Sequence, residues 1–158
     1  MGRGFAEGSK RVARMNLAAA DVLDRETFHD LVSDADPLVR AAAAGRPDLS
    51  VALMAMLAND TRAPVRAALA ANPAIFRAEA ALTALLADSA TVVAEGLVEN
   101  PETPRWVLEK LVFHRRRPVR IKAQHALDGT SPERAEAPTH PVGARMHGGG
   151  FAASGTDG

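Results

Sequence analysis

Hydrophobic positions in this chain return in groups about every 26 residues. The central valines of successive groups lie 26, 28 and 26 residues apart, and we place the two extra residues of the long interval at Ile75 and Phe76. Within the second group Val65 and Leu69 are four residues apart, on one face of a helix. Such a period is typical of stacked helical units that bury their apolar faces only against their neighbours. The four valines are Val39, Val65, Val93 and Val119.

A second apolar stripe comes just before each valine group. Its members lie two, three and six residues before an aligned polar residue, which is the spacing of one helix face. The pattern therefore predicts that each unit pairs a short first helix, which contains the valine, with a longer second helix. The aligned polar residues are Asp34, Asp60, Asp88 and His114. The stripe consists of Phe28, Leu31, Val32, Met54, Leu57, Ala58, Leu82, Leu85, Leu86, Leu108, Leu111 and Val112.

Proline marks the predicted helix ends. Pro64 fits the first turn of a helix, where its missing N–H is not needed. Asp36 before Pro37 adds an acidic N-cap. Asn72 and Asn100 each precede a proline, and the residue before proline avoids the α region, so these positions are expected to end helices.

Composition favours one all-α domain. Hydrophobic residues make up 47% of the chain, which is enough for a core, and aromatic residues only 4%. Much of this content is alanine, which has the highest helix propensity, whereas a β-sandwich needs more valine, threonine and tyrosine. The absence of cysteine excludes disulfides, iron–sulfur clusters and zinc sites with cysteine ligands. No apolar run is long enough to span a membrane, so we expect a cytoplasmic protein without a membrane partner.

The Val-Arg pairs at 39–40, 65–66 and 119–120, the Asn-Pro pairs, and segments 57–60 and 85–88 together resemble the leucine-rich repeat variant family. More loosely they are similar to HEAT-type arrays, and the resemblance covers roughly residues 21–127. It implies a right-handed helical-repeat solenoid of about four units, whose short helix is often 3₁₀-like. The chain departs from the pattern at Arg46 in place of Asn, Ala94 in place of Arg and His114 in place of Asp. The family is defined by its architecture, so the resemblance implies no reaction.

Aspartate and arginine recur six residues apart, as Asp34 with Arg40 and Asp60 with Arg66. We expect a structural ladder that joins the end of one unit to the start of the next, rather than an acidic functional site. At the same spacing Asp88 is followed by Ala94, so the sequence predicts one unpaired aspartate.

The two ends differ from the repeat in composition. Residues 1–14 lack clear periodicity and form the predicted flexible N-terminal segment, and because helical pattern begins near Leu17, Met15 is a candidate start codon. The helical-repeat domain takes in residues 15–128, and Gly129 is the expected C-cap of its last helix. Residues 129–158 are rich in Gly, Pro and Ala and cannot bury enough apolar surface to offset their ordering entropy, which predicts a disordered tail.

No catalytic constellation is present. The patterns Gly-x-Ser-x-Gly, His-Glu-x-x-His and the Walker spacing are absent, and His29, His114 and His125 fall in different units. His140 and His147 in the tail lack a carboxylate or cysteine partner and make a poor metal site. We therefore expect no enzyme activity, no metal and no cofactor.

Charge is polarised along the chain although its net charge is zero. Residues 21–102 hold 13 acidic and 6 basic residues, whereas residues 103–127 hold 7 basic residues against Glu109 alone. Trp106 and Phe113 lie seven residues apart in this basic region, hence on the same side of a helix predicted over residues 103–113. The candidate partner-binding residues are Arg105, Trp106, Lys110, Phe113, Arg115, Arg116, Arg117 and Arg120.

Two uses of this region remain open. An aromatic pair beside a basic cluster can dock an acidic peptide or stack on nucleic-acid bases. Alternatively, Trp106 and Phe113 seal the array against a terminal helix, residues 119–127, and the arginines keep its open end soluble. Because the acidic body would repel phosphate, we favour a non-catalytic scaffold that binds an acidic protein partner. A nucleic-acid binder that uses the basic C-terminal helices is the alternative.

Overall fold

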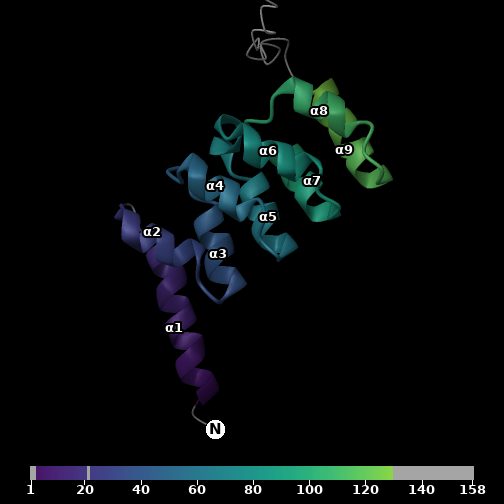
Figure 1. The fold of residues 1–158 in the computed structure, drawn as a ribbon. Helices are drawn as coiled ribbons and strands as arrows, with labels where there is room; N and C mark the ends of the chain where they lie inside the picture. Colours follow the sequence, from purple (N-terminus) through teal and green to yellow (C-terminus); the bar gives the residue numbers. More distant parts are fainter. Residues whose placement is uncertain (1–2, 21, 130–158) are drawn as a thin grey trace, which may run out of the picture.

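The computed structural model describes residues 3–20 and 22–129, and all regular structure in these residues is helical (Figure 1). No strand occurs in the described ranges, which confirms the all-α prediction. Nine α-helices and one 3₁₀ helix, η1, follow one another in the described residues. They are α1 (Arg3–Ala18), α2 (Arg25–Val32), α3 (Pro37–Ala44), α4 (Val51–Leu57), α5 (Ala63–Ala70), η1 (Pro73–Arg77), α6 (Glu79–Leu86), α7 (Thr91–Glu99), α8 (Arg105–Leu111) and α9 (Arg117–Asp128).

The helices pack in the order of the chain. The four helices that carry the repeated valines, α3, α5, α7 and α9, contact one another in sequence, and we call them the valine row. In the same way α2 contacts α4 and α4 contacts α6, while α1 packs against α3 and α2 at the N-terminal end. Figure 1 shows the helix pairs following one another from α1 to the pair of α8 and α9. Each pair therefore packs against the pairs before and after it.

Both predicted apolar stripes lie in the core. The four valines have no exposed surface, and Leu31, Leu57 and Leu85 are each at most 2% exposed. Two members of the second stripe, Leu86 and Val112, are only half-buried. Leu86 is the last residue of α6, and Val112 is the C-cap of α8.

The prediction of a short first helix and a longer second helix is wrong. In the valine row α3, α5 and α7 have 8, 8 and 9 residues, whereas the following α4, α6 and α8 have 7, 8 and 7. Capping residues rather than the apolar stripe set these bounds. The side chain of Ser50, for example, accepts a hydrogen bond from Leu53 N–H and begins α4. The 3₁₀ helix η1 contains Ile75 and Phe76, where the two extra residues were placed.

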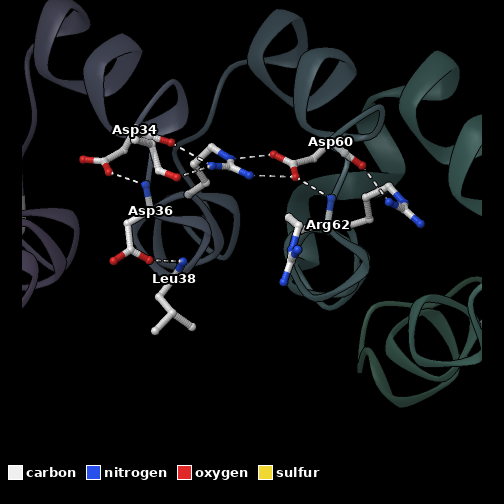
Figure 2. Close-up of polar contacts among 8 residues, drawn as sticks. Asp34, Asp36, Leu38, Asp60 and Arg62 are labelled. Atoms are coloured by element: carbon white, nitrogen blue, oxygen red, sulfur yellow. Dashed lines mark hydrogen bonds and ion pairs between the residues drawn. The ribbon is translucent and has the colours of Figure 1, made fainter.

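An arginine–aspartate ladder connects the valine row, but its pairs differ from the predicted ones. The guanidinium of Arg40 binds the carboxylate of Asp60, with Nε–Oδ2 and Nη2–Oδ1 distances of 2.6 and 3.1 Å. Its Nη1 donates to the Asp34 carbonyl at 2.7 Å, so Arg40 links the turns at Asp34 and Asp60 (Figure 2). Arg66 repeats this arrangement with Asp88 at 2.5 and 3.2 Å. Asp88, predicted to be unpaired, therefore has a partner in the preceding helix of the row.

Each ladder aspartate also caps its own turn. Asp60 accepts a hydrogen bond from Arg62 N–H at 2.8 Å, and Asp88 accepts one from Ala90 N–H at 2.7 Å (Figure 2 shows the first). Burial alone would raise the pKa of both carboxyl groups, but the hydrogen bonds from arginine and backbone outweigh it and hold each pKa below its usual value. Both aspartates therefore stay ionised at neutral pH.

A second ladder satisfies carbonyl groups at the C-terminal ends of the valine-row helices. Asn72 Nδ2 donates to the carbonyls of Ala44 and Arg46 at 2.7 and 2.6 Å. Asn100 Nδ2 donates in the same way to Ala70 and Asn72, at 3.0 and 2.9 Å. The last carbonyls of a helix have no hydrogen-bond donor within that helix. Each asparagine supplies the donor for these carbonyls in the preceding helix of the valine row. Both side chains are buried and fully engaged in this role.

Arg46 stands at the position of these asparagines and makes equivalent bonds. Its Nη1 donates to the carbonyls of Ala18 and Ala20 at 2.8 and 2.6 Å. The guanidinium is fixed by the carboxylate of Asp48 and lies 5.1 Å from the ring centroid of Phe28. The departure from the family pattern at this position therefore preserves the interaction.

The N-terminal helix α1 belongs to the same series, which the sequence analysis did not predict. It starts well before the expected onset of helical pattern near Leu17, and the boundary drawn between residues 14 and 15 falls inside it. Arg14, 26 residues before Arg40, binds the carboxylate of Asp34 at 2.7 Å. The valine and proline that mark the other units are missing from α1, so only the arginine spacing carries the signal.

At the other end Gly129 is the C-cap of α9, as predicted, and its N–H donates to the carbonyl of His125. The rest of the predicted disordered tail, with His140 and His147, lies outside the described residues.

Helices α5 and α7 come closest to each other at Gly96. A Cβ added there would lie 2.9 Å from the carbonyl oxygen of Ala67 and 3.1 Å from the Cβ of Ala70. A backbone carbonyl cannot swing aside as the end of a long side chain can, so this contact requires glycine. Gly8 in α1 is the opposite case, since an added Cβ would meet no atom within 4 Å.

We expect Gly96→Ala to lower the free energy of unfolding by about 1–3 kcal/mol, because the methyl group pushes α7 away from α5. Gly8→Ala should raise it by up to about 1 kcal/mol, because only helix propensity changes. Urea unfolding followed by circular dichroism measures both values. Equal effects at the two glycines would contradict the close approach.

A second prediction concerns the asparagine ladder. Asn100→Ala should lower the free energy of unfolding by about 2–3 kcal/mol, because it leaves two buried carbonyls without a donor. Asn59→Ala is the control, since Asn59 is exposed in the turn after α4 and its side chain donates to the Ala55 carbonyl of that helix. Its loss should stay near about 0.5 kcal/mol. If chemical denaturation gave Asn100→Ala no larger loss than the control, the ladder would not hold the helices together.

Candidate functional site at the basic turn

The predicted binding residues gather around the turn between α8 and α9. Helix α8 ends at Leu111, so Phe113 lies in the turn and not on the helix predicted to carry it. Its side chain is 85% exposed. Three consecutive arginines follow it, the last of which begins α9. We call residues 113–117 the basic turn.

The exposure of Phe113 follows from the repeat. The same turn position carries Ser33, Asn59 and Ala87 in the other units, and all three are exposed. Since α2, α4, α6 and α8 all end one or two residues before this position, its side chain lies in a turn and is exposed. A small or polar residue suffices there for folding, so the fold does not require an aromatic ring.

Trp106 has a different environment, although it was predicted to share one surface with Phe113. It is half-buried and packs against the core. Lys110 Nζ lies 5.0 Å from the centroid of its ring, in a cation–π arrangement. The sealing role therefore fits Trp106, whereas Phe113 is left on the surface. The seven-residue spacing misled because the helix ends between the two residues.

Some of the positive charge at this end is neutralised by neighbouring carboxylates. Arg105 pairs with Glu109 at 3.0 Å. Lys122 pairs with Glu95 and Glu99 of α7 at 3.1 and 2.7 Å. Hydrogen bonds from Lys122 to these two glutamates raise its pKa. These contacts tie α9 to α7 and leave the basic turn as the remaining cationic surface.

The arginines of the basic turn bond to carbonyls rather than to carboxylates. Arg115 donates to the carbonyl of Ser89. Arg120, one helical turn further on, donates from Nη1 to the carbonyl of His114 at 3.0 Å. A carbonyl orients a guanidinium but leaves its charge in place. Among the residues that the structure describes, no carboxylate pairs with Arg120 or with the three arginines of the basic turn.

The arginine–aspartate ladder is interrupted beside this turn. Ala94 and His114 replace both partners of one rung, since they lie 20 residues apart, as do Arg40 and Asp60. His114 caps its turn as the ladder aspartates do, because its Nδ1 accepts a hydrogen bond from the N–H two residues further on, that of Arg116, at 3.2 Å. With both charged residues replaced, the rung contains no unpaired buried ion.

Both departures were predicted from the sequence, but their place on the same rung was not. The predicted pairing used the six residues from aspartate to arginine within one turn, whereas the ion pair joins an arginine to the aspartate 20 or 22 residues later. The interval of 20 residues was the signal that could have paired Ala94 with His114.

Helices α7 and α9 also meet through larger side chains than the other helices of the valine row. Lys122 takes the place in α9 that Gly96 has in α7, and α7 presents Glu95 and Glu99 where α5 presents alanines. A groove of about 400 Å³ lies between α7 and α9. It is lined by Val98, Glu99, Ile121, Lys122 and His125.

A larger hollow of about 580 Å³ lies between α2 and α4 and includes Phe28, His29 and Asp48. The Asp48 carboxylate is bound by Arg46, which lowers its pKa, so it is not free to act as a base beside His29. Within the described part of the chain, no group of three or more acidic or histidine side chains could hold a metal ion. In the same ranges no helix has the length and apolar content needed to cross a bilayer.

His114 makes stability depend on pH. Its burial and the charges of Arg115, Arg116 and Arg120 lower the pKa of His114 below its usual 6.5. The folded protein therefore binds this proton more weakly than the unfolded chain does. It follows that the free energy of unfolding is unaffected above pH 6.5 and decreases as the pH falls toward the folded pKa.

We expect His114→Asn to remove part of the stability loss between about pH 7 and pH 5, because its side-chain carbonyl still accepts the backbone bond but does not titrate there. Thermal unfolding at both pH values measures the effect, and His125→Asn, at an exposed position in α9, is the control. An unchanged pH dependence in His114→Asn would show that His114 titrates alike in the folded and unfolded states.

Comparison of the chain with protein-family models gave no match, and neither a curated protein nor a solved structure matched it. The function is therefore argued from the geometry of the chain itself.

Proposed function

We propose that this protein is a non-catalytic cytoplasmic scaffold that binds an acidic protein through the basic turn. The proposal includes its architecture, a right-handed solenoid of about four helical units of the leucine-rich repeat variant or HEAT type. Support comes from the two ladders, which repeat the same bonds from helix to helix of the valine row. Repeated units of this kind offer an extended surface and need no catalytic residues.

The observation that carries the proposal is the exposure of Phe113. Phe113 is 85% exposed, and three arginines, residues 115–117, follow it after His114. Aromatic side chains and arginine are the residue types enriched where proteins bind most tightly. A partner that covers Phe113 would remove its apolar surface from water, and acidic side chains around it would pair with the arginines.

Nucleic acid is the second candidate ligand of the same turn. An exposed ring can stack on a base, and arginines can contact phosphates. The charge of the rest of the chain favours the protein partner, because residues 21–102 hold 13 acidic and 6 basic residues and would repel a strand that followed the helices. Binding to duplex DNA would also weaken by about 0.9 log units per phosphate contact for each tenfold rise in salt.

Phe113→Ser tests the proposal, because it introduces the residue that the first unit carries at this position, Ser33. We expect it to reduce capture of the partner by about tenfold or more. Val22→Ser is the matched control, since Val22 is 86% exposed and lies between α1 and α2. Tagged proteins are used for affinity purification from the cell lysate, with and without nuclease, and bound proteins are identified by mass spectrometry.

An acidic protein that survives nuclease, is lost with Phe113→Ser and is retained with Val22→Ser would support the scaffold function. Loss of all bound material after nuclease would favour the nucleic-acid alternative. A partner captured equally well by Phe113→Ser would show that binding occurs elsewhere.

A further inference from the structure

Arg120 occupies in α9 the place that Arg40 and Arg66 occupy in α3 and α5. Its Nη1 donates to the carbonyls of the two residues that open its turn, at 3.0 and 3.2 Å. The Nη1 of Arg40 makes the same two bonds in its own turn, at 2.7 and 3.3 Å. The turn therefore holds the guanidinium of Arg120 in the way that the ladder arginines are held.

In Arg40 and Arg66 the other two guanidinium nitrogens, Nε and Nη2, bind a carboxylate, and we call these two donors the fork. Nε and Nη2 of Arg40 bind Asp60, and the same atoms of Arg66 bind Asp88. This planar fork matches both oxygens of a carboxylate, which makes the contact strong and directional. At Arg120 no carboxylate of the described residues takes this place. The Nη1 bonds orient the guanidinium of Arg120, and its Nε and Nη2 have no carboxylate acceptor among the described residues.

We propose that Arg120 is a carboxylate-binding site and that its ligand is an aspartate in a helix-capping turn of an acidic partner protein. The inference rests on the proposed scaffold function and specifies the partner's chemistry. Asp60 and Asp88 are the templates, because each binds an arginine fork while it accepts the N–H two residues further on. A partner that presents such a turn adds one more rung to the ladder.

The face of α9 beside this fork suits a different partner better than another unit of the same kind. Inside the array, Ala67 and Ala70 of α5 allow α7 to approach closely. The matching positions of α9 carry Ile121 and Gln124, which are both exposed. Ile121 is 46% exposed and offers apolar surface on α9. A helix docked here would be recognised by charge and by Ile121 rather than by close backbone contact.

Charge distinguishes the possible occupants of this site. A second copy stacked end to end would bring α1 against the basic end, and the aspartates next to α1, Asp34 and Asp36, are already paired with its arginines. Residues 130–158 carry three acidic and two basic residues, which offers little net attraction. A separate acidic protein is the complementary occupant. The ladder aspartates of the chain itself are already bound by arginines, namely Asp34, Asp60 and Asp88.

The chain supplies a probe for the site. A synthetic peptide of residues 79–100 spans α6 and α7, contains Asp88 in the turn between them, and has four acidic and no basic residues. We expect this peptide, fluorescently labelled, to bind the full chain in an anisotropy titration. The Asp88→Asn peptide should bind about tenfold more weakly than the Glu79→Gln peptide, which has the same net charge.

Protein variants locate the peptide on the chain. Arg120→Lys keeps the positive charge but removes the fork, and should weaken binding about tenfold. Arg62→Lys is the matched control, at an exposed position before α5 and outside the basic turn, and should change binding by no more than about twofold. The Asp88→Asn peptide should lose nothing further with Arg120→Lys, since both changes remove the same interaction.

Absence of binding by the unmodified peptide would overturn the proposal. So would equal binding of the two peptide variants, or equal binding by Arg120→Lys and Arg62→Lys. Binding that requires deletion of residues 130–158 would identify the chain's own C-terminal segment as the occupant and would also overturn it. If Arg120→Lys binds the peptide normally while Phe113→Ser loses the cellular partner, the scaffold function stands without this site. The converse result would retain the site and reject the basic turn.

Discussion

The last carbonyl groups of a helix have no partner within that helix, and in this protein the next helix of the valine row covers them. Asn72 and Asn100 supply the missing donors from the following helix, and Arg46 does the same for α1. Alanine and glycine at the contact let the backbones come close enough for these short side chains to reach. Close approach and satisfied helix ends therefore depend on each other, and the order of the helices follows from both.

The ladders have a direction, which explains why the two ends of the protein differ. Each asparagine donates hydrogen bonds to carbonyls at the end of the preceding helix of the valine row. Each ladder arginine instead binds the aspartate in the turn before the next helix of that row. At the N-terminal end α1 supplies Arg14 for the first aspartate. At the other end the direction of the ladder leaves the fork of Arg120 without a carboxylate among the described residues. The position of this guanidinium is thus a consequence of how the core repeats.

The basic turn lies at the point where the repeat becomes less regular. Between α7 and α9 the arginine and aspartate of one rung are replaced by Ala94 and His114, and Lys122 stands where glycine allowed close contact. Exposed ion pairs, which contribute about 0–1 kcal/mol each, replace part of the close packing there. Packing is less restrictive at the end of the helix series. Phe113 and the arginines of the basic turn can therefore occur there, although the fold does not require them.

Much of the fold could be read from the chain alone. Apolar residues at helical spacing identify the buried valines and leucines, because burial in a stacked core requires that spacing at every repeat. Proline and aspartate likewise mark helix starts through local bonds, as at Asp36 and Pro37. The basic region and its candidate residues follow directly from composition. Helix α1 was not predicted as part of the repeat, because its residues have the arginine spacing but lack the apolar and proline signals.

The sequence by itself determined the all-helical class, the residues of the core and the presence of an arginine–aspartate ladder, since these depend on local spacing. The tertiary structure decided which aspartate each arginine binds, because an arginine can reach its own turn and the next one, and only packing brings the second within 3.1 Å. It also separated Trp106 from Phe113, since the end of α8 lies between them. The fork of Arg120 became recognisable as a site for the same reason, because its function depends on what the neighbouring helix provides.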